Sequence, residues 1–172
     1  MITGTAQTWL ARLGWILLAL TLASPGWAKE PPQIGELTAL DRQFMQAQRE
    51  SLESLARRHL GTDFSGETDR DLDLLQRLLD RDLVKADQKR ELQAMGVILG
   101  ELLAKELDMH WVLYEDPVGR SRALRYRDSD LYLFPMTMIS RRREAGDQTP
   151  VAVIYASAVD EIRSELPPLP FQ

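Results

Sequence analysis

The sequence predicts an α+β fold in which about three N-terminal helices pack on a small, mainly antiparallel sheet of about four strands. Three observations lead to this prediction. Apolar residues recur at helical spacing in three segments between residues 37 and 107. After Leu107, short runs rich in aromatic and β-branched residues alternate with turn residues, as antiparallel strands do. A proline-led segment, 135–146, then predicts a short helix before the last strand.

The start of the chain has the pattern of a secretory signal peptide over residues 1–28. One basic residue, Arg12, precedes an uncharged apolar run over 13–23, and a small-x-small pattern ends at Ala28. The run is shorter than the roughly 20 apolar residues that a membrane span requires. We therefore expect cleavage after Ala28 and a periplasmic or secreted protein with no membrane span. The alternative is an uncleaved anchor, in which Trp9 and Leu10 extend the run.

Composition limits the classes of function. Beyond residue 28 the chain has 20 basic and 26 acidic residues, a net charge of −6, which together with export disfavours binding to nucleic acid. It has no cysteine, so a packed core must stabilise it without disulfides. An exported protein of this kind is typical of the bacterial periplasm. We predict a linker over 29–36, a single α+β domain over 37–166 and an extended tail over 167–172.

Three helices are expected before the sheet. The first covers about 37–60, the second begins near Thr68, and the third covers about 88–107. Gly96 and Gly100 lie one turn apart within the third helix. A glycine inside a helix costs about 1 kcal/mol relative to alanine. Two of them on one stripe predict that another part of the chain packs closely there.

The sheet is expected to begin with a hairpin. Asp116, Pro117 and Gly119 fit a type I turn between its two strands. Neighbouring side chains in a strand point to opposite faces, so His110 and Trp111 are not partners, and Trp111 is expected to pack in the core. In chain order the expected elements are strands at 109–115, 120–127 and 131–134, a helix from Pro135 to about residue 146, a strand at 150–158 and a short helical end at 159–165.

The chain lacks the sequence motifs of common enzymes. It contains no G-x-S-x-G, S-x-x-K, H-E-x-x-H, C-x-x-C or phosphate-binding loop. Its two histidines, His59 and His110, lie on different expected elements. One alternative remains open, a small hydrolase centred on Glu106, Asp108 and His110.

The acidic segment 69–80 resembles a calcium loop only in its spacing of carboxylates. Such a loop requires a glycine at its sixth position, where this chain has Leu74. The leucines keep a helical period through the segment, so the carboxylates would spread around a helix. We predict no metal site and no cofactor.

Seven arginines between residues 120 and 143 form a basic region in an acidic protein. One interpretation is a solvated face on which Arg120 and Arg122 pair with Glu115. The other is a surface for an anion or a partner protein, because arginine binds carboxylates and phosphates through two parallel hydrogen bonds. The candidate binding residues are Arg125, Arg127, Arg141, Arg142 and Arg143.

A set of features in the second half of the chain follows a familiar order and spacing. They are Gly96, Gly100, Glu101, Trp111, the turn from Asp116 to Gly119, Leu124-Arg125-Tyr126, Phe134-Pro135, Ile139, Arg142 and Gly146. Together they resemble the bacterial domain of unknown function 3806 over about residues 90–157. The resemblance implies a small α+β module, no established activity and no assigned catalytic residue.

Three functions are consistent with these patterns. The first is a non-catalytic binding module for a protein or an anionic component of the cell envelope. The second is the hydrolase centred on His110 and Asp108. The third is an inhibitor or immunity-type protein, in which the acidic helix over 69–82 would face a basic partner. The sequence leaves the oligomeric state open.

Overall fold

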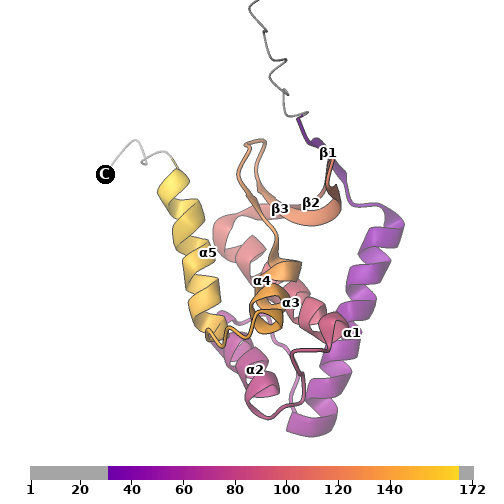
Figure 1. Cartoon of the computed structure of the whole chain (residues 1–172), viewed down its shortest axis with the longest axis vertical. Helices are drawn as coiled ribbons and strands as arrows, with labels where there is room; N and C mark the ends of the chain where they lie inside the picture. Colours follow the sequence, from indigo (N-terminus) through magenta and orange to yellow (C-terminus); the bar gives the residue numbers. More distant parts are fainter. Residues whose placement is uncertain (1–30, 167–172) are drawn as a thin grey trace, which may run out of the picture.

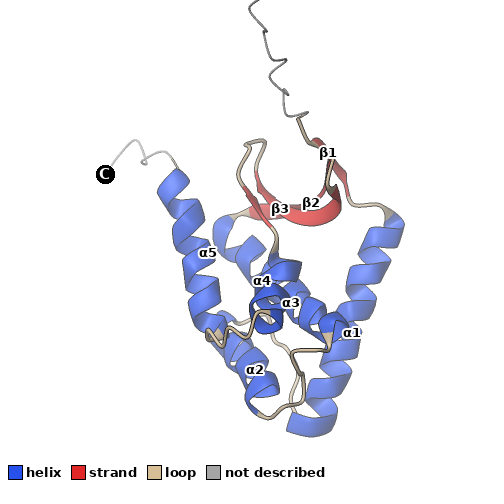
Figure 2. Cartoon of the chain, in the orientation of Figure 1, coloured by secondary structure: helices blue, strands red, loops and turns tan. Residues whose placement is uncertain are grey.

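The computed structural model describes residues 31–166 and has an α+β fold. In chain order its elements are β1 (Gln33–Glu36), α1 (Ala39–Leu60), α2 (Thr68–Asp80), α3 (Lys89–Leu107), β2 (Met109–Asp116), β3 (Gly119–Tyr126), β4 (Tyr132–Leu133), α4 (Pro135–Glu144) and α5 (Val151–Glu165). The sheet lies across one end of the helices, with α1 and α5 on opposite sides of the molecule (Figures 1 and 2). The expected signal peptide and the expected tail at 167–172 lie outside the described residues.

The sheet has four antiparallel strands in the order β1-β2-β3-β4. Strands β2 and β3 form the expected hairpin, with Asp116 opposite Gly119 at its tip. The Asp116 carboxylate accepts hydrogen bonds from the backbone N–H groups of Val118, at 2.9 Å, and Gly119, at 3.0 Å. Gly119 has φ = 150°, a conformation that side chains disfavour. Local turn chemistry therefore determines the position of the hairpin.

The prediction of a last strand at 150–158 is wrong, because this segment belongs to helix α5. Its buried residues are Val151, Ile154, Tyr155, Ala158, Val159 and Ile162, at spacings of three and four. The β-branched composition favoured a strand, but the helical spacing of these residues lets one face pack on α2 and α3. The helices are therefore not all N-terminal, since α4 and α5 follow the sheet.

The fourth strand comes instead from the segment that was expected to be a linker. Gln33–Glu36 forms β1 and pairs with β2, with Ile34 opposite Tyr114. Its side chains are mostly exposed, so no apolar alternation marks it in the sequence. Pro31 and Pro32 lie immediately before it, at the edge of the sheet, where proline is tolerated.

Helix α3 runs through the centre of the core, and its two glycines lie against other parts of the chain. A Cβ on Gly96 would lie 2.5 Å from both the Met136 Cα and the Pro135 carbonyl oxygen at the start of α4. A Cβ on Gly100 would lie 2.4 Å from the ring of Trp111. The close approach of α4 and β2 to α3 therefore requires both glycines.

Within residues 31–166, no helix combines the length and the apolar character that crossing a membrane requires.

Candidate functional site

A cavity of about 530 Å³ opens between α1, α3, the β2–β3 hairpin and α4, and we call it the hairpin pocket. Its charged lining residues are Asp116, Arg120, Arg122 and Arg141, its aromatic ones are Phe44, Tyr114 and Phe134, and its uncharged polar ones are Gln93, Ser121 and Thr137. The volume falls within the range of roughly 300–1,000 Å³ that is usual for small-ligand pockets. The pocket thus combines cationic, aromatic and hydrogen-bonding groups.

The arginines of the hairpin are held by a buried carboxylate on α1. Asp41 is 2% exposed and forms a capping box with Thr38, in which each side chain accepts a hydrogen bond from the backbone N–H of the other residue. The same carboxylate pairs with Arg120 and with Arg122, each at 2.8 Å. Hydrogen bonds from Thr38, with smaller effects of Arg122 and Arg120, lower the pKa of Asp41 although burial opposes this. Asp41 therefore stays ionised and connects α1 to the hairpin.

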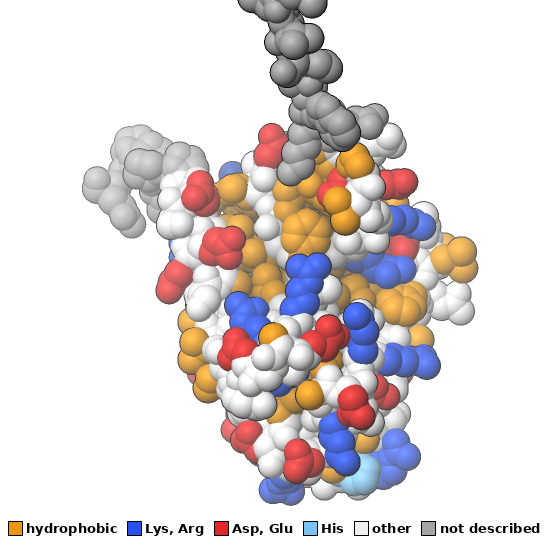
Figure 3. Space-filling view, viewed as in Figure 1, with side chains coloured by type: hydrophobic (Ala, Val, Ile, Leu, Met, Phe, Trp, Pro, Cys, Tyr) orange, Lys and Arg blue, Asp and Glu red, His pale blue; other side chains and the backbone are white. Residues whose placement is uncertain are grey.

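The pocket has more positive than negative charge. Arg120, Arg122 and Arg141 contribute three positive charges, against the carboxylates of Asp41 and Asp116. Among the described residues, no ion pair or side-chain hydrogen bond holds the exposed guanidinium of Arg141. On the face drawn in Figure 3, basic side chains lie beside apolar surface across the middle of the molecule. Within residues 31–166, the cavity therefore has a surplus of one positive charge and several guanidinium donors in its lining that no described side chain occupies.

Aromatic rings form the apolar part of the hairpin pocket. The ring of Tyr114 meets that of Phe134 edge to face, with centroids 5.2 Å apart. The guanidinium of Arg122 lies 4.3 Å from the centroid of Phe44, a favourable cation–π distance. Phe44 is 37% exposed and Val118, at the hairpin tip, is 95% exposed. The rings thus provide a surface on which an apolar group can pack.

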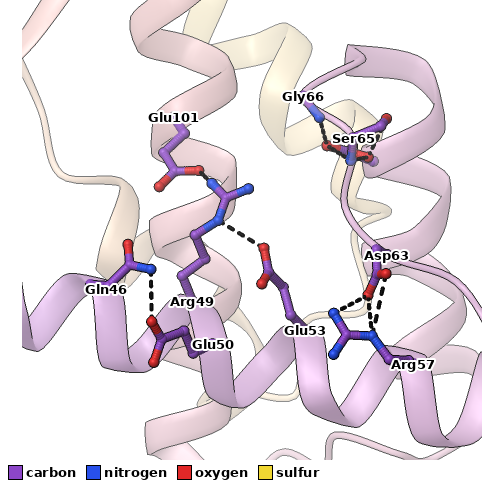
Figure 4. Close-up of polar contacts among 10 residues, drawn as sticks. Gln46, Arg49, Glu50, Glu53, Arg57, Asp63, Ser65, Gly66 and Glu101 are labelled. Carbon is purple, nitrogen blue, oxygen red and sulfur yellow. Dashed lines mark hydrogen bonds and ion pairs between the residues drawn. The ribbon is translucent and has the colours of Figure 1, made fainter.

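A second, smaller cavity of about 270 Å³ lies between α1, α3 and the connector before α2, and we call it the α1–α3 cleft. Arg49 bridges Glu101 and Glu53 in this region (Figure 4). Partial burial raises the pKa of Glu101, although Arg49 opposes this. Lys105 donates to the Gly66 carbonyl oxygen at 3.0 Å. The charged groups of this cleft are therefore engaged with one another or with the backbone.

Asp71 lies beside the α1–α3 cleft and is 1% exposed. Its carboxylate accepts hydrogen bonds from the backbone N–H groups of Ser65, at 2.8 Å, and Gly66, at 2.7 Å, and from the Ser65 hydroxyl. This carboxylate attaches the connector to the start of α2. The inhibitor hypothesis requires the acidic side chains of 69–82 to be exposed to a basic partner. Asp71 does not meet this requirement, because it is buried.

The structure separates the five arginines that the sequence singled out. The guanidinium of Arg125 donates to the carbonyl oxygens of Ser129, at 2.7 Å, and Asp128, at 2.8 Å. Arg127, which was expected to end the strand at 120–127, instead follows the end of β3 and has φ = 47°, so it does not share a strand face with Arg125. Arg127 lies over the Tyr126 ring instead. Neither arginine lines the hairpin pocket.

The other three arginines lie on α4 in three different environments. Arg142 donates to the Met138 carbonyl oxygen at 2.8 Å. Arg143 is buried and donates to Asp147, Gln148 and Thr149, which closes the turn after α4. Of the five candidates, Arg141 alone reaches the hairpin pocket.

Several residues of the hairpin pocket were not singled out by the sequence. The prediction that Arg120 and Arg122 pair with Glu115 is wrong, because both pair with Asp41, 79 positions from Arg120. Phe44 appears in the sequence as one more apolar residue of the first helix. The capping box was the available signal for Asp41, since Thr38 stands three residues before it. No local pattern connects Asp41 to the hairpin.

The three residues of the hydrolase hypothesis do not form a common site. His110 is exposed, Asp108 is 3.7 Å from Arg127, and Glu106 pairs with Arg163. None of these three side chains lines the hairpin pocket or the α1–α3 cleft. Within residues 31–166, no group of three or more His, Cys, Asp or Glu side chains is placed to hold a metal ion.

Comparison with known proteins gives a family and a fold. The family model described as "Domain of unknown function (DUF3806)" matches residues 71–155, which begin in α2 and end in α5. A crystal structure of a protein from Bacteroides thetaiotaomicron VPI-5482 is similar, with a TM-score of 0.69 and 24% sequence identity. The similarity covers 77% of this chain and 49% of that chain, so this chain spans about half of that protein's length. At this identity the likeness shows the fold alone. No curated protein matches this chain.

Proposed function

Because residues 71–155 belong to the DUF3806 family, whose description assigns no activity, we propose a function from the hairpin pocket itself. The domain is a non-catalytic binding module that holds the anionic group of a ligand in this pocket. The observation that carries the proposal is the surplus of guanidinium donors in an aromatic-lined cavity. The ligand is an anionic component of the cell envelope or an anionic group of a protein.

The chemistry of arginine supports this proposal. A guanidinium has five N–H donors in a fixed plane, and a carboxylate or phosphate accepts two of them in parallel. Asp41 receives one bond each from Arg120 and Arg122, so further donors of the exposed Arg120 remain for a ligand. Arg141 adds a guanidinium that pairs with no side chain in the part of the chain that the structure describes. The Asp41 ion pairs hold the hairpin arginines in position, which lowers the entropy lost on binding.

The lining also favours binding over catalysis. Among the described residues that line the hairpin pocket there is no histidine, and the one carboxylate, that of Asp116, accepts two hydrogen bonds from the backbone of the turn through Oδ1. Arginine stays protonated at all physiological pH values, so it cannot act as a proton-transfer group. The pocket can therefore bind and orient an anion, and its groups are poorly suited to moving protons.

The test uses a simple probe with one carboxylate and one ring. We expect benzoate, titrated into ¹⁵N-labelled protein, to shift the backbone NMR signals of Ser121, Arg122 and Arg141, and added salt to weaken binding. Benzamide, which has the same shape without the charge, is expected to have little effect. Arg141→Gln should weaken benzoate binding, whereas Arg127→Gln, which removes an arginine outside the pocket, should not. Equal responses to benzoate and benzamide would contradict the proposal.

We also propose that the protein is exported, on the basis of the signal-peptide pattern that ends at Ala28. Expression in a Gram-negative bacterium, followed by cell fractionation and N-terminal sequencing, tests this proposal. The expected result is a periplasmic protein that begins at Lys29. A membrane-bound product that keeps Met1 would support the anchor alternative instead.

A further inference from the structure

We propose that the ligand of the hairpin pocket is the C-terminal end of a protein or peptide whose last residue is apolar. The terminal α-carboxylate would bind Arg141 and Arg120, and the last side chain would pack on the aromatic rings. This inference rests on the proposed function and narrows it to one class of ligand.

The charge of the pocket matches a single carboxylate. Its three lining arginines are offset by the carboxylate of Asp41, which pairs with Arg120 and Arg122, and by that of Asp116, which leaves a surplus of one positive charge. A chain end has one negative charge, whereas a phosphate monoester has nearly two at neutral pH. A single carboxylate can accept two parallel hydrogen bonds from one guanidinium, here that of Arg141, and a further one from Arg120.

The apolar part of the pocket matches the position of a terminal side chain. In a C-terminal residue, the carboxylate and the side chain are attached to the same Cα. A site for that residue therefore requires cationic and apolar groups within one small cavity. The hairpin pocket has both, since Phe44, Tyr114 and Phe134 line the same cavity of about 530 Å³ as the arginines. The ring of Phe44 is in direct contact with the guanidinium of Arg122.

The pocket also has uncharged groups that suit a peptide backbone. Gln93 and Ser121 line it, and within residues 31–166 neither side chain forms a hydrogen bond. An amide side chain offers both a donor and an acceptor, as the N–H and C=O groups of a peptide bond require. A free aromatic acid has no groups that use these positions.

The surroundings of the pocket favour a macromolecule over a small free acid. Val118 at the hairpin tip is 95% exposed, and Leu40, next to Asp41 on α1, is 77% exposed. Val118 lines the pocket, and Leu40 precedes the lining residue Phe44 by about one turn of α1, so both would be available to the residues that precede the chain end. Burial of such exposed apolar side chains against a partner is favourable because it removes apolar surface from water.

Three short peptides and the purified protein test this inference by isothermal titration calorimetry. The first is acetyl-Ala-Ala-Phe with a free carboxylate, the second is the same peptide with an amidated end, and the third is acetyl-Asp-Ala-Phe-amide, whose carboxylate is internal. We expect the free-ended peptide to bind at least about tenfold more tightly than the other two. We expect Arg141→Gln to abolish that preference and Arg127→Gln to preserve it.

A fourth peptide, acetyl-Ala-Ala-Gly with a free carboxylate, tests the apolar subsite and is expected to bind about tenfold more weakly than the Phe peptide. Equal binding of the free-ended and amidated Phe peptides would overturn the chain-end inference. If benzoate still bound through Arg141 in that case, the anion-binding function would stand. If neither benzoate nor any of the peptides bound, both proposals would be wrong.

Discussion

Two buried aspartates, each in the first turn of a helix, have opposite surroundings. Asp71 in α2 is surrounded by uncharged donors, namely the backbone N–H groups of Ser65 and Gly66 and the hydroxyl of Ser65. Asp41 in α1 is bound by Thr38 and by two arginines of the hairpin. Both carboxylates are almost fully buried. The residue type and its burial are therefore the same, and the chemistry of the partners differs.

The two sites differ in how many hydrogen-bond donors are left over once the aspartate carboxylate has its own hydrogen bonds. A backbone N–H has one proton to donate, so the donors around Asp71 have no further capacity and the arrangement is closed. A guanidinium has five N–H protons, so the arginines around Asp41 can bind a second anion. A site with no donors left over, such as that of Asp71, can only stabilise the fold. A site with unused donors beside a cavity, such as that of Asp41, can also bind a ligand. Four predictions test this distinction.

The largest effect is expected at Asp71. Asp71→Ala would remove three hydrogen bonds to a carboxylate and leave the N–H groups of Ser65 and Gly66 without their partner. We expect the free energy of unfolding to fall by about 3 kcal/mol, measured by urea denaturation. Asp69→Ala, an exposed aspartate in the same turn, is the control and should cost at most about 1 kcal/mol through the helix dipole.

The same Asp71 variant also tests the separation of the two regions. Asp71 does not line the hairpin pocket, so benzoate affinity should be unchanged in any Asp71→Ala protein that remains folded. A loss of affinity in a folded Asp71→Ala variant would mean that the α1–α3 cleft takes part in binding.

A smaller loss of stability, together with altered binding, is expected at Asp41. Asp41→Asn keeps the shape of the side chain but removes the charge that pairs with Arg120 and Arg122. We expect a loss of about 2 kcal/mol in the free energy of unfolding, because those arginines are partly exposed and water screens them. Benzoate should bind more tightly, because the added positive charge of the pocket outweighs the loss of the ion pairs that position Arg120 and Arg122.

The stability difference between wild type and Asp41→Asn should depend on pH, because the pKa of Asp41 is lowered in the folded protein. The pKa of the folded state lies below the ordinary value of 3.8, so the ionised carboxylate stabilises the fold above that value. This contribution is lost as the pH falls through the lowered pKa. The difference in stability between wild type and Asp41→Asn should therefore be constant near neutral pH and disappear in acid. A difference that grows in acid would contradict this assignment.

A still smaller change in stability, a gain instead of a loss, is expected when Glu101 in the α1–α3 cleft is replaced by glutamine. Burial raises its pKa above the ordinary value of 4.5, so the folded state favours the protonated form. That contribution is present at low pH and is lost as the pH rises through the raised pKa. Glu101→Gln, which is always neutral, should therefore be more stable than wild type at pH 7 and equal to it near pH 4.

Glu101 is partly exposed, so screening by water should keep this gain below about 1 kcal/mol. Thermal unfolding at several pH values measures it. A variant that is less stable than wild type at pH 7 would show that the Arg49 pair outweighs the cost of burial. Benzoate affinity should not change, because Glu101 does not line the hairpin pocket.

The smallest effect on stability is expected at Arg141. Its guanidinium has no partner among the described side chains, so Arg141→Gln should change the free energy of unfolding by no more than about 0.5 kcal/mol. The same change should weaken benzoate binding. Together with Asp71→Ala, it would separate the two regions completely, since one variant affects stability alone and the other affects binding alone. A large loss of stability in Arg141→Gln would show that the arginine has a structural partner.

The sequence alone identified the features that depend on neighbours along the chain. Helical spacing located α1, α2 and α3, and turn chemistry located the hairpin at Asp116 and Gly119. Two glycines one turn apart indicated a close approach to α3, although not which part of the chain makes it. The α+β class and the DUF3806 family were likewise accessible, because order, spacing and residue type determine them.

Tertiary structure decided the remaining features, which depend on residues far apart in the chain. Helix α5 has the composition of a strand, and packing on α2 and α3 determines its conformation. Strand β1 has no apolar pattern, and pairing with β2 defines it. The arginines looked alike in the sequence, but folding buries Arg143 in a turn and places Arg141 at a cavity, where no side chain within residues 31–166 pairs with it. The sequence shows which charged groups the chain contains, whereas the fold determines which of these groups pair with other residues and which have donors left for a ligand.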